Sequence, residues 1–347
     1  MTKALIAMSG GVDSSVAAYL AQTAGYDCIG ATMRLCDGLV PENSGPEDAK
    51  KIADRLNMPF YVFDHTALFR EKVVDAFVRC YEEGGTPNPC LYCNRHLKFD
   101  ALLQEAQSLG CEYVVTGHYA RIEKEEATGR YLLKKAVDEK KDQSYFLSCL
   151  TQHQLSHTLF PLGAMTKEEA RVLAEKQGFV TAKKKDSQDV CFIPDGDYRS
   201  FMVKYTGKTY PAGDYLDLCG KIVGKHSGAV GYTIGQRKGL GIALGEPVYV
   251  CSKDMLRNTV TVGPDAALFG TALIGGDWNW ISMETLTEPI RCKARIRYRH
   301  TEQPATVTPL PDGTAKVEFD QPQRAITPGQ TVVLYDGDTV IGGGTIL

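Results

Sequence analysis

Short apolar segments alternate with helical patterns from Lys3 to Gly178. The pattern predicts strands at residues 3–8, 27–34, 60–64 and 112–116, and helices at 13–24, 46–57, 67–83 and 94–109. A hairpin is expected over 119–136 and a further helix over 166–177, with Thr166 and Glu169 as its capping box. Strand and helix in alternation are typical of a parallel sheet covered on both faces. Ligands of such sheets bind beyond the carboxyl ends of the strands.

The pattern changes after Gly207, where glycine and proline separate short β-rich segments. A chain of 347 residues also exceeds what one core usually organises. We therefore expect an α/β domain over residues 1–203, a small β-rich domain over 204–268 and a C-terminal β-barrel over 269–347. Strands are predicted at 248–250, 259–262, 291–299, 314–319 and 331–334, and Trp278 and Trp280 are expected in the core.

Composition narrows the classes of function. The 39 basic and 42 acidic residues give a net charge of −3, so a nucleic acid would have to be held by local basic patches. There is no apolar run of the roughly 18 residues that span a bilayer, and the N-terminus lacks a signal-peptide layout. We expect a cytoplasmic protein without a membrane partner. Its 11 irregularly spaced cysteines do not suggest a disulfide scaffold in that compartment.

The segment Ser9-Gly10-Gly11-Val12-Asp13-Ser14 lies between the first predicted strand and the first predicted helix. It matches neither the Walker A motif nor GxGxxG. Its glycines let the backbone approach a ligand, and the amides at a helix start attract anions. Ser9 and Ser14 add hydroxyl donors, and Asp13 can hold a metal ion on a bound phosphate. The alternative is a tight turn with Asp13 as the helix N-cap.

Two segments carry cysteines of chemical interest. Cys93 is expected just before a helix capped by Asn94, where the helix N-terminus, Arg95 and Lys98 would stabilise a thiolate. Cys191 follows Lys183, Lys184 and Lys185 in a polar segment. Because Val190 and Phe192 flank it, Cys191 is either a packed small residue or a reactive thiol.

Basic residues gather near the C-terminal end. Arg295, Arg297 and Arg299 alternate along a predicted strand, with Tyr298 on the opposite face. Arg237 and Lys238 lie in a glycine-rich loop. These side chains form either a solvated surface or a surface that follows the phosphates of an RNA.

The Ser9–Ser14 segment resembles the signature of the PP-loop ATP pyrophosphatases, which cleave ATP between the α and β phosphates. Together with the two cysteine segments, the whole chain resembles the bacterial-type tRNA-specific 2-thiouridylases, the MnmA family. Supporting segments are Thr116–Arg121, Lys141–Leu147, Gly235–Gly241, Arg297–Arg299 and Thr327–Gln330. The resemblance implies transfer of sulfur to C2 of the wobble uridine in lysine, glutamate and glutamine tRNAs.

The resemblance also implies the sites. ATP, with Mg²⁺, would be held by Ala7, Met8, Ser9, Gly10, Gly11, Val12, Asp13, Ser14, Met33 and Gly117, and would adenylate the uracil O2. Cys191 would carry the sulfur as a persulfide from a cysteine desulfurase or relay protein. Cys93 would be the nucleophile that releases it, closing a transient Cys93–Cys191 disulfide. Residues that match tRNA contacts are Asn88, Pro89, Cys90, His118, Lys141, Asp142, Gln143, Tyr298, Arg299 and Gln330.

Cys90 departs from the family pattern, in which this position is often another residue. Cys90, Cys93 and Cys191 could instead hold a [4Fe-4S] cluster with an open iron position. The persulfide route does not require Cys90. Two other functions stay open: a PP-loop ligase acting on a metabolite, and a non-catalytic RNA-binding or redox-sensing protein. A ligase has no need of two reactive cysteines, and a lapsed site has no reason to keep Asp13 and both glycines.

Overall fold

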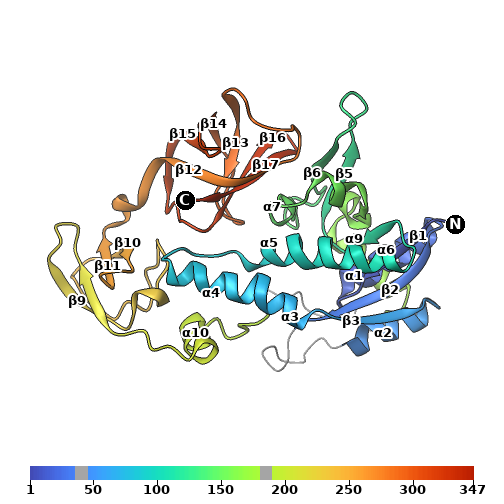
Figure 1. Ribbon diagram of the computed structural model, residues 1–347, viewed down its shortest axis with the longest axis horizontal. Helices are drawn as coiled ribbons and strands as arrows, with labels where there is room; N and C mark the ends of the chain where they lie inside the picture. The colour runs from blue at the N-terminus through green and yellow to red at the C-terminus, as the bar shows by residue number, and fades with distance from the viewer. Residues whose placement is uncertain (36–45, 180–189) are drawn as a thin grey trace.

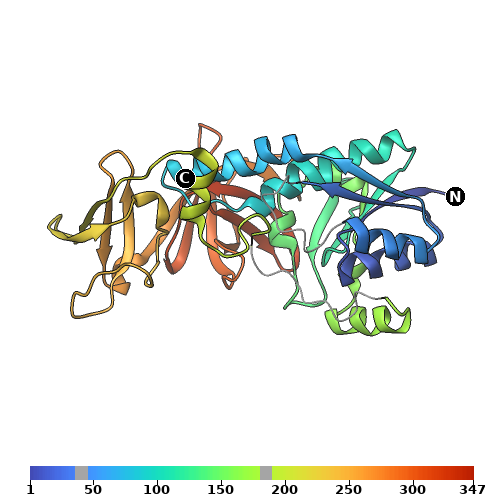
Figure 2. The same ribbon diagram turned by 90° about the horizontal axis from the view of Figure 1, so that it is seen from below.

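The computed structural model describes residues 1–35, 46–179 and 190–347. The molecule is elongated, with the parallel sheet at one end, the sheet of β8–β11 at the other and a barrel between them (Figures 1 and 2). Within the described ranges, no helix combines the length and the apolar character needed to cross a bilayer.

The parallel sheet has the order β3-β2-β1-β4-β7. The four predicted strands are confirmed as β1 (Lys3–Ala7), β2 (Asp27–Arg34), β3 (Phe60–Asp64) and β4 (Tyr113–Val115). The fifth, β7 (Thr158–Leu159), is too short to show a pattern in the sequence. Strand order reverses at β1, whose neighbours are β2 and β4, so ligands are expected at the carboxyl ends of these strands.

Helices cover both faces of the sheet. On β1, Ala4 and Ile6 pack against α1 (Val12–Thr23), α2 (Pro46–Arg55) and α9 (Lys167–Lys176). Leu5, which points the other way, packs against α6 (Leu102–Ser108). This alternation follows the two-residue period of a strand, and it explains why β1 is apolar from Ala4 to Ala7.

Two long helical segments cross the middle of the molecule (Figure 1). The first is formed by α3 (Thr66–Phe69), the π-helical η1 (Arg70–Val74) and α4 (Asp75–Glu82). The second is formed by α5 (Pro89–Cys93), the π-helical η2 (Asn94–Ala101) and α6. This second helix was predicted to start at Asn94, which is wrong: Asn88 is the N-cap and Pro89 opens the first turn. Proline is well suited to that position because its missing N–H would have no partner there anyway.

The chain between β4 and the barrel contains the remaining helices. The predicted hairpin is confirmed as β5 (Ala120–Lys124) and β6 (Tyr131–Lys135). It is followed by α7 (Ser144–Leu147), α8 (Gln152–Ser156), the 3₁₀ turn η3 (Pro161–Ala164), α9 and α10 (Tyr198–Thr206). The capping box of Thr166 and Glu169 at the start of α9 is also confirmed.

The β-rich remainder forms two units. The first is a four-stranded sheet of β8 (Gly213–Leu216), β9 (Ile222–His226), β10 (Tyr249–Asp254) and β11 (Thr259–Gly263), with the 3₁₀ turn η4 (Ala229–Gly231) before β10. After η5 (Asp265–Leu268), the barrel contains β12 (Phe269–Trp280), β13 (Ile290–Arg295), β14 (Gln303–Pro309), β15 (Ala315–Arg324), β16 (Thr331–Asp336) and β17 (Thr339–Ile346). It closes by pairing β12 with β17. Trp278 and Trp280 stack at 4.7 Å and pack against its core.

The barrel and the α/β domain share a hydrophobic core. The hairpin β5–β6 joins the barrel sheet where Lys134 pairs with Thr339 of β17. Beneath it, Leu133 and Tyr145 pack with Ile281, Val333 and Tyr335 of the barrel side. The two units therefore hold each other in a set orientation, which fixes how the barrel faces the cysteine segments.

Candidate active site

The loop between β1 and α1 is held in shape by its own serines. Gly10 adopts a φ of 69°, and Gly11 is the N-cap of α1. The Ser9 N–H donates to Ser14 Oγ at 3.2 Å, and Ser14 Oγ donates to the Gly11 carbonyl at 3.1 Å. The alternative with Asp13 as N-cap is therefore wrong. Within the described part of the chain no side chain caps α1, so its first N–H groups are available to an anion.

Other segments of the protein pack closely against one side of the loop. A Cβ on Gly117 would lie 2.6 Å from the Asp13 carbonyl carbon, and one on Gly10 would lie 3.0 Å from Asp48 Cβ of α2. Among the described residues, a Cβ on Gly11 would meet only Ser9 Oγ, at 3.4 Å. These residues thus leave space over Gly11 for a ligand to approach the backbone. This arrangement fits a bound polyphosphate.

The residues predicted to hold ATP lie together. Ala7 ends β1 and Met8 to Ser14 follow it, Met33 is the last residue but one of β2, and Gly117 lies two residues after the end of β4. Since β2 and β4 both neighbour β1 in the sheet, all of these residues are at the same edge. Whether each one contacts a nucleotide stays a prediction.

Asp13 has two partners that the sequence did not indicate. Its carboxylate accepts hydrogen bonds from Lys167 Nζ at 2.7 and 2.8 Å and from the Tyr119 hydroxyl at 2.9 Å. The Lys167 side chain is only 9% exposed. Lysine in the first turn of a helix is the one signal that could have pointed to it, because a cation is unfavourable there.

The structure also brings the cysteine segments together. Cys93, 9% exposed, belongs to the same buried cluster as Phe192 and Ile193. The charges of both Cys93 and Cys90 act on the Cys191 thiol. Cys93 and Cys191 are both free thiols here. Of the segment before Cys191, residues 180–189, with the three lysines, lie outside the described residues.

The expected activation of the Cys93 thiol is wrong. Cys93 ends the first turn of α5 instead of preceding a helix, and Arg95 pairs with Asp277 at 2.9 Å. Burial raises the pKa of Cys93, and Lys98 opposes that effect. Cys191 is exposed as a whole residue, but its sulfur is largely shielded from water. This shielding, together with the nearby Cys93 and Cys90, raises the pKa of Cys191 to about 11. Both thiols are therefore protonated at neutral pH.

This protonation predicts how Cys191 reacts in the free, metal-free protein. The thiolate is the reactive form. Because the Cys191 pKa is raised to about 11, its alkylation by iodoacetamide should accelerate about tenfold per pH unit between about pH 7 and 10. Peptide mass spectrometry gives the rate, with the exposed Cys219 as an internal reference. A rate that levels off near pH 8.5, the value of an unperturbed thiol, would contradict the expectation.

The described residues do not form a ready-made metal site around the three thiols. In the three described stretches of the chain, no group of three or more His, Cys, Asp or Glu side chains is arranged to hold a metal ion. Cys90 is exposed, whereas Cys93 is buried. The arrangement favours the route that needs only Cys93 and Cys191.

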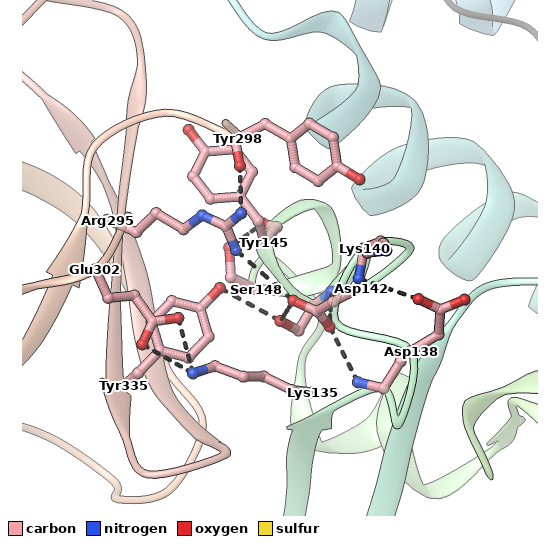
Figure 3. A network of polar contacts seen from close by, with 12 residues as sticks. Lys135, Asp138, Lys140, Asp142, Tyr145, Ser148, Arg295, Tyr298, Glu302 and Tyr335 are labelled. Carbon is pink, nitrogen blue, oxygen red and sulfur yellow. Dashed lines mark hydrogen bonds and ion pairs between the residues drawn. The ribbon is translucent and has the colours of Figure 1, made fainter. Parts of the chain in front are cut away.

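Several residues predicted to contact tRNA form the joint between the α/β domain and the barrel (Figure 3). Asp142, 5% exposed, accepts hydrogen bonds from the Ala136 N–H and the Ser144 hydroxyl and lies 3.7 Å from Arg295. Burial raises the pKa of Asp142, and these partners oppose it. Arg295 ends β13, so the predicted strand through Arg299 is wrong and the three arginines do not share one strand face.

The other predicted tRNA residues are placed differently. Gln330 donates to the Thr86 carbonyl at 2.8 Å, which ties the barrel to the segment of Asn88, Pro89 and Cys90. Gln143 accepts from the Tyr119 N–H at 2.9 Å. His118, Lys141 and Tyr298 are half-buried, and Arg299 is exposed. The Tyr298 ring lies 4.4 Å from that of Phe146, and burial lowers the pKa of His118 so that its imidazole is neutral.

Three family models cover nearly the whole chain. The tRNA methyl transferase HUP domain matches residues 2–195, the tRNA methyl transferase PRC-barrel domain residues 199–264, and the Aminomethyltransferase beta-barrel domain residues 270–346. The solved structure of the U34-tRNA thiolase NcsA from Methanococcus maripaludis is a weak match, with a TM-score of 0.36 and 17% identity over 59% of this chain and 67% of that one.

Curated relatives match from end to end. A protein of Clostridioides difficile is 49% identical over 99% of this chain and 98% of its own length. One from Clostridium acetobutylicum is 48% identical over 99% of both chains, and one from Heliobacterium modesticaldum is 49% identical over 99% of this chain and 92% of its own. All three are named tRNA-specific 2-thiouridylase MnmA. With its nucleotide loop, its paired cysteine segments and this full-length identity, the chain belongs to the MnmA family of tRNA-specific 2-thiouridylases.

Proposed function

We propose that this protein is an ATP-dependent sulfurtransferase that replaces the C2 oxygen of the wobble uridine with sulfur in lysine, glutamate and glutamine tRNAs. One observation supports it most directly. Met33, at the nucleotide edge of the sheet, packs against the buried cluster that contains Cys93 and Phe192. The nucleotide loop and the two thiols are therefore neighbours, as a reaction that activates and then thiolates one base requires.

In this proposal the loop residues hold ATP together with Mg²⁺. The ATP supplies the adenylyl group that turns the uracil O2 into a leaving group. Sulfur reaches Cys191 as a persulfide from a cysteine desulfurase or a relay protein. The Cys93 thiol attacks the Cys191 sulfur, the persulfide S–S bond breaks, and the outer sulfur leaves with the electron pair and the Cys93 proton as HS⁻. The sulfide adds to C2 and AMP departs with the former O2. The resulting Cys93–Cys191 disulfide takes two electrons from a cytoplasmic thiol reductant before the next turnover.

The domain division and tRNA contacts belong to the same proposal. Residues 1–203 carry the chemistry, 204–268 form the middle unit and 269–347 the barrel. Arg299 and Lys141 lie at the rim of the joint between barrel and catalytic unit, where an RNA can reach them. Asp142 and Gln143 would act by keeping that joint in shape. The target base must leave its stack to reach the thiols.

Mass spectrometry of wobble nucleosides tests the function. A strain without the gene should lack 2-thiouridine derivatives in the three tRNAs, and the wild-type gene should restore them. The masses distinguish exchange of oxygen for sulfur from addition of a methyl group, the reaction named by two of the family models. Unchanged 2-thiouridine in the deletion strain would refute the proposal.

A further inference from the structure

Lys167 occupies a position that its own helix disfavours. It is the first residue of α9, directly after the N-cap Thr166, where the helix dipole is positive. The next two residues, Glu168 and Glu169, are acidic, as the dipole favours. A lysine kept at a position where the helix dipole disfavours a cation is expected to interact with a group outside the helix.

The side chain of Lys167 is directed at the nucleotide loop. Its Nζ lies 2.7 and 2.8 Å from the two oxygens of Asp13 and 5.9 Å from the centre of the Tyr119 ring. Its backbone N–H donates to Asp138 at 3.0 Å, which fixes the start of α9. The Lys167 side chain is 9% exposed and that of Asp13 is 33% exposed. The ammonium is thus buried, whereas the carboxylate that it contacts is partly exposed.

The starts of two helices meet at this point. Val16 and Ala17 of α1 pack in one cluster with Ala170 and Ala174 of α9, so the helices lie side by side (Figures 1 and 2). The N–H groups of α9 are served by its capping box, whereas α1 has no side-chain cap among the described residues. The amides of α1, the positive ends of α1 and α9 and the Lys167 ammonium all attract negative charge to this point. The single negative charge of Asp13 does not neutralise them all, so the place suits a bound anion.

We propose that Lys167 binds the β- and γ-phosphates of ATP and retains the pyrophosphate as it leaves, with Asp13 holding the ammonium in position until nucleotide arrives. This inference rests on the proposed use of ATP at the Ser9–Ser14 loop. When the uracil O2 bonds to the α-phosphorus, the bond to the bridging oxygen breaks and its electron pair stays on the β-phosphate. An ammonium is a compact cation with three donors, suited to stabilise that charge.

Calorimetric binding of ATP, pyrophosphate and AMP to the full chain, with Mg²⁺ and without tRNA, tests the proposal. Lys167→Met should weaken binding of ATP and pyrophosphate by about 10- to 100-fold, the usual loss for a charged hydrogen bond. Binding of AMP should stay within about twofold, because AMP lacks those phosphates. Lys167→Arg should retain most of the affinity. Lys176→Met, an exposed lysine in the last turn of the same helix, is the matched control and should bind like the wild type.

A second comparison separates phosphate binding from mere neutralisation of Asp13. Asp13→Asn removes the negative charge that Lys167 would neutralise. In the double variant, which also carries Lys167→Met, no carboxylate at position 13 is then left without its ammonium partner. If Lys167 binds phosphate, Asp13→Asn/Lys167→Met should bind ATP at least about tenfold more weakly than Asp13→Asn alone. Equal affinities in these two variants, or an equal loss of AMP and ATP in Lys167→Met, would overturn the proposal. A wild-type protein that fails to bind ATP would instead refute the use of ATP itself.

Discussion

Cys93→Ser and Cys191→Ser should each abolish thiolation of tRNA, while each variant should still bind tRNA with nearly wild-type affinity. The physical reason is that a serine hydroxyl can neither carry a persulfide sulfur nor attack one. Cys93 lies inside a packed cluster, and replacing sulfur by oxygen there changes the side-chain volume little. The fold should therefore survive, and with it the proposed tRNA contacts at the joint with the barrel. Retardation of thiolated tRNA in a mercury-containing gel measures the product, and filter binding measures affinity.

Two further cysteine variants serve as controls. Cys219→Ser changes an exposed thiol in the middle unit and should leave activity unchanged. Cys90→Ser should retain activity if only Cys93 and Cys191 handle sulfur. Activity that persists in Cys93→Ser or Cys191→Ser would refute the two-thiol mechanism. Activity lost in Cys90→Ser, together with bound iron in protein purified without oxygen, would favour a cluster instead.

Gly117→Ala should weaken the binding of ATP. The added Cβ would lie 2.6 Å from the Asp13 carbonyl carbon and 2.8 Å from the Ser14 nitrogen. Both are backbone atoms at the start of α1, so the clash can be relieved only by moving the helix start or the segment after β4. Overpacking of this kind costs about 1–3 kcal/mol of unfolding free energy. Because the same movement displaces the amides that face the phosphates, we expect affinity for ATP to fall at least about tenfold.

The matched control is Gly270→Ala in the barrel. There, within the described part of the chain, the new methyl group would meet only the end of the Ile326 side chain, at 3.4 Å, which can adjust. Calorimetry of ATP binding and denaturant unfolding of both variants give the comparison. Gly117→Ala protein that binds ATP like the wild type would show that the contact between the segment after β4 and α1 does not shape the nucleotide site.

Features that depend on neighbours in sequence were predictable. The central strands are apolar on both faces because helices cover both faces, so β1, β2 and β4 were evident from their composition. The capping box of Thr166 and Glu169 depends on residues three apart, and it is present. The glycine-rich turn between β1 and α1 was likewise predictable from its own residues.

Features that depend on contacts between distant segments were predicted less well. The strand through Arg299 was expected because its residues alternate, yet β13 ends at Arg295, whose side chain turns toward Asp142. The Cys93 thiolate was expected from nearby basic residues, yet Arg95 pairs with Asp277 of the barrel. In both cases a partner far away in the chain determines where the side chain goes, and no local pattern contains that partner.

The amino-acid sequence by itself therefore determined the order of strands and helices, the nucleotide loop and the family. These follow from periodicity, turn chemistry and motif spacing, which act over a few residues at a time. Tertiary structure alone decided that Cys191 lies beside Cys93, that Lys167 faces Asp13 and that both thiols are protonated at rest. Packing brings remote segments together and removes them from water. The protonation state of a buried group therefore depends more on the residues packed around it than on its neighbours in the chain.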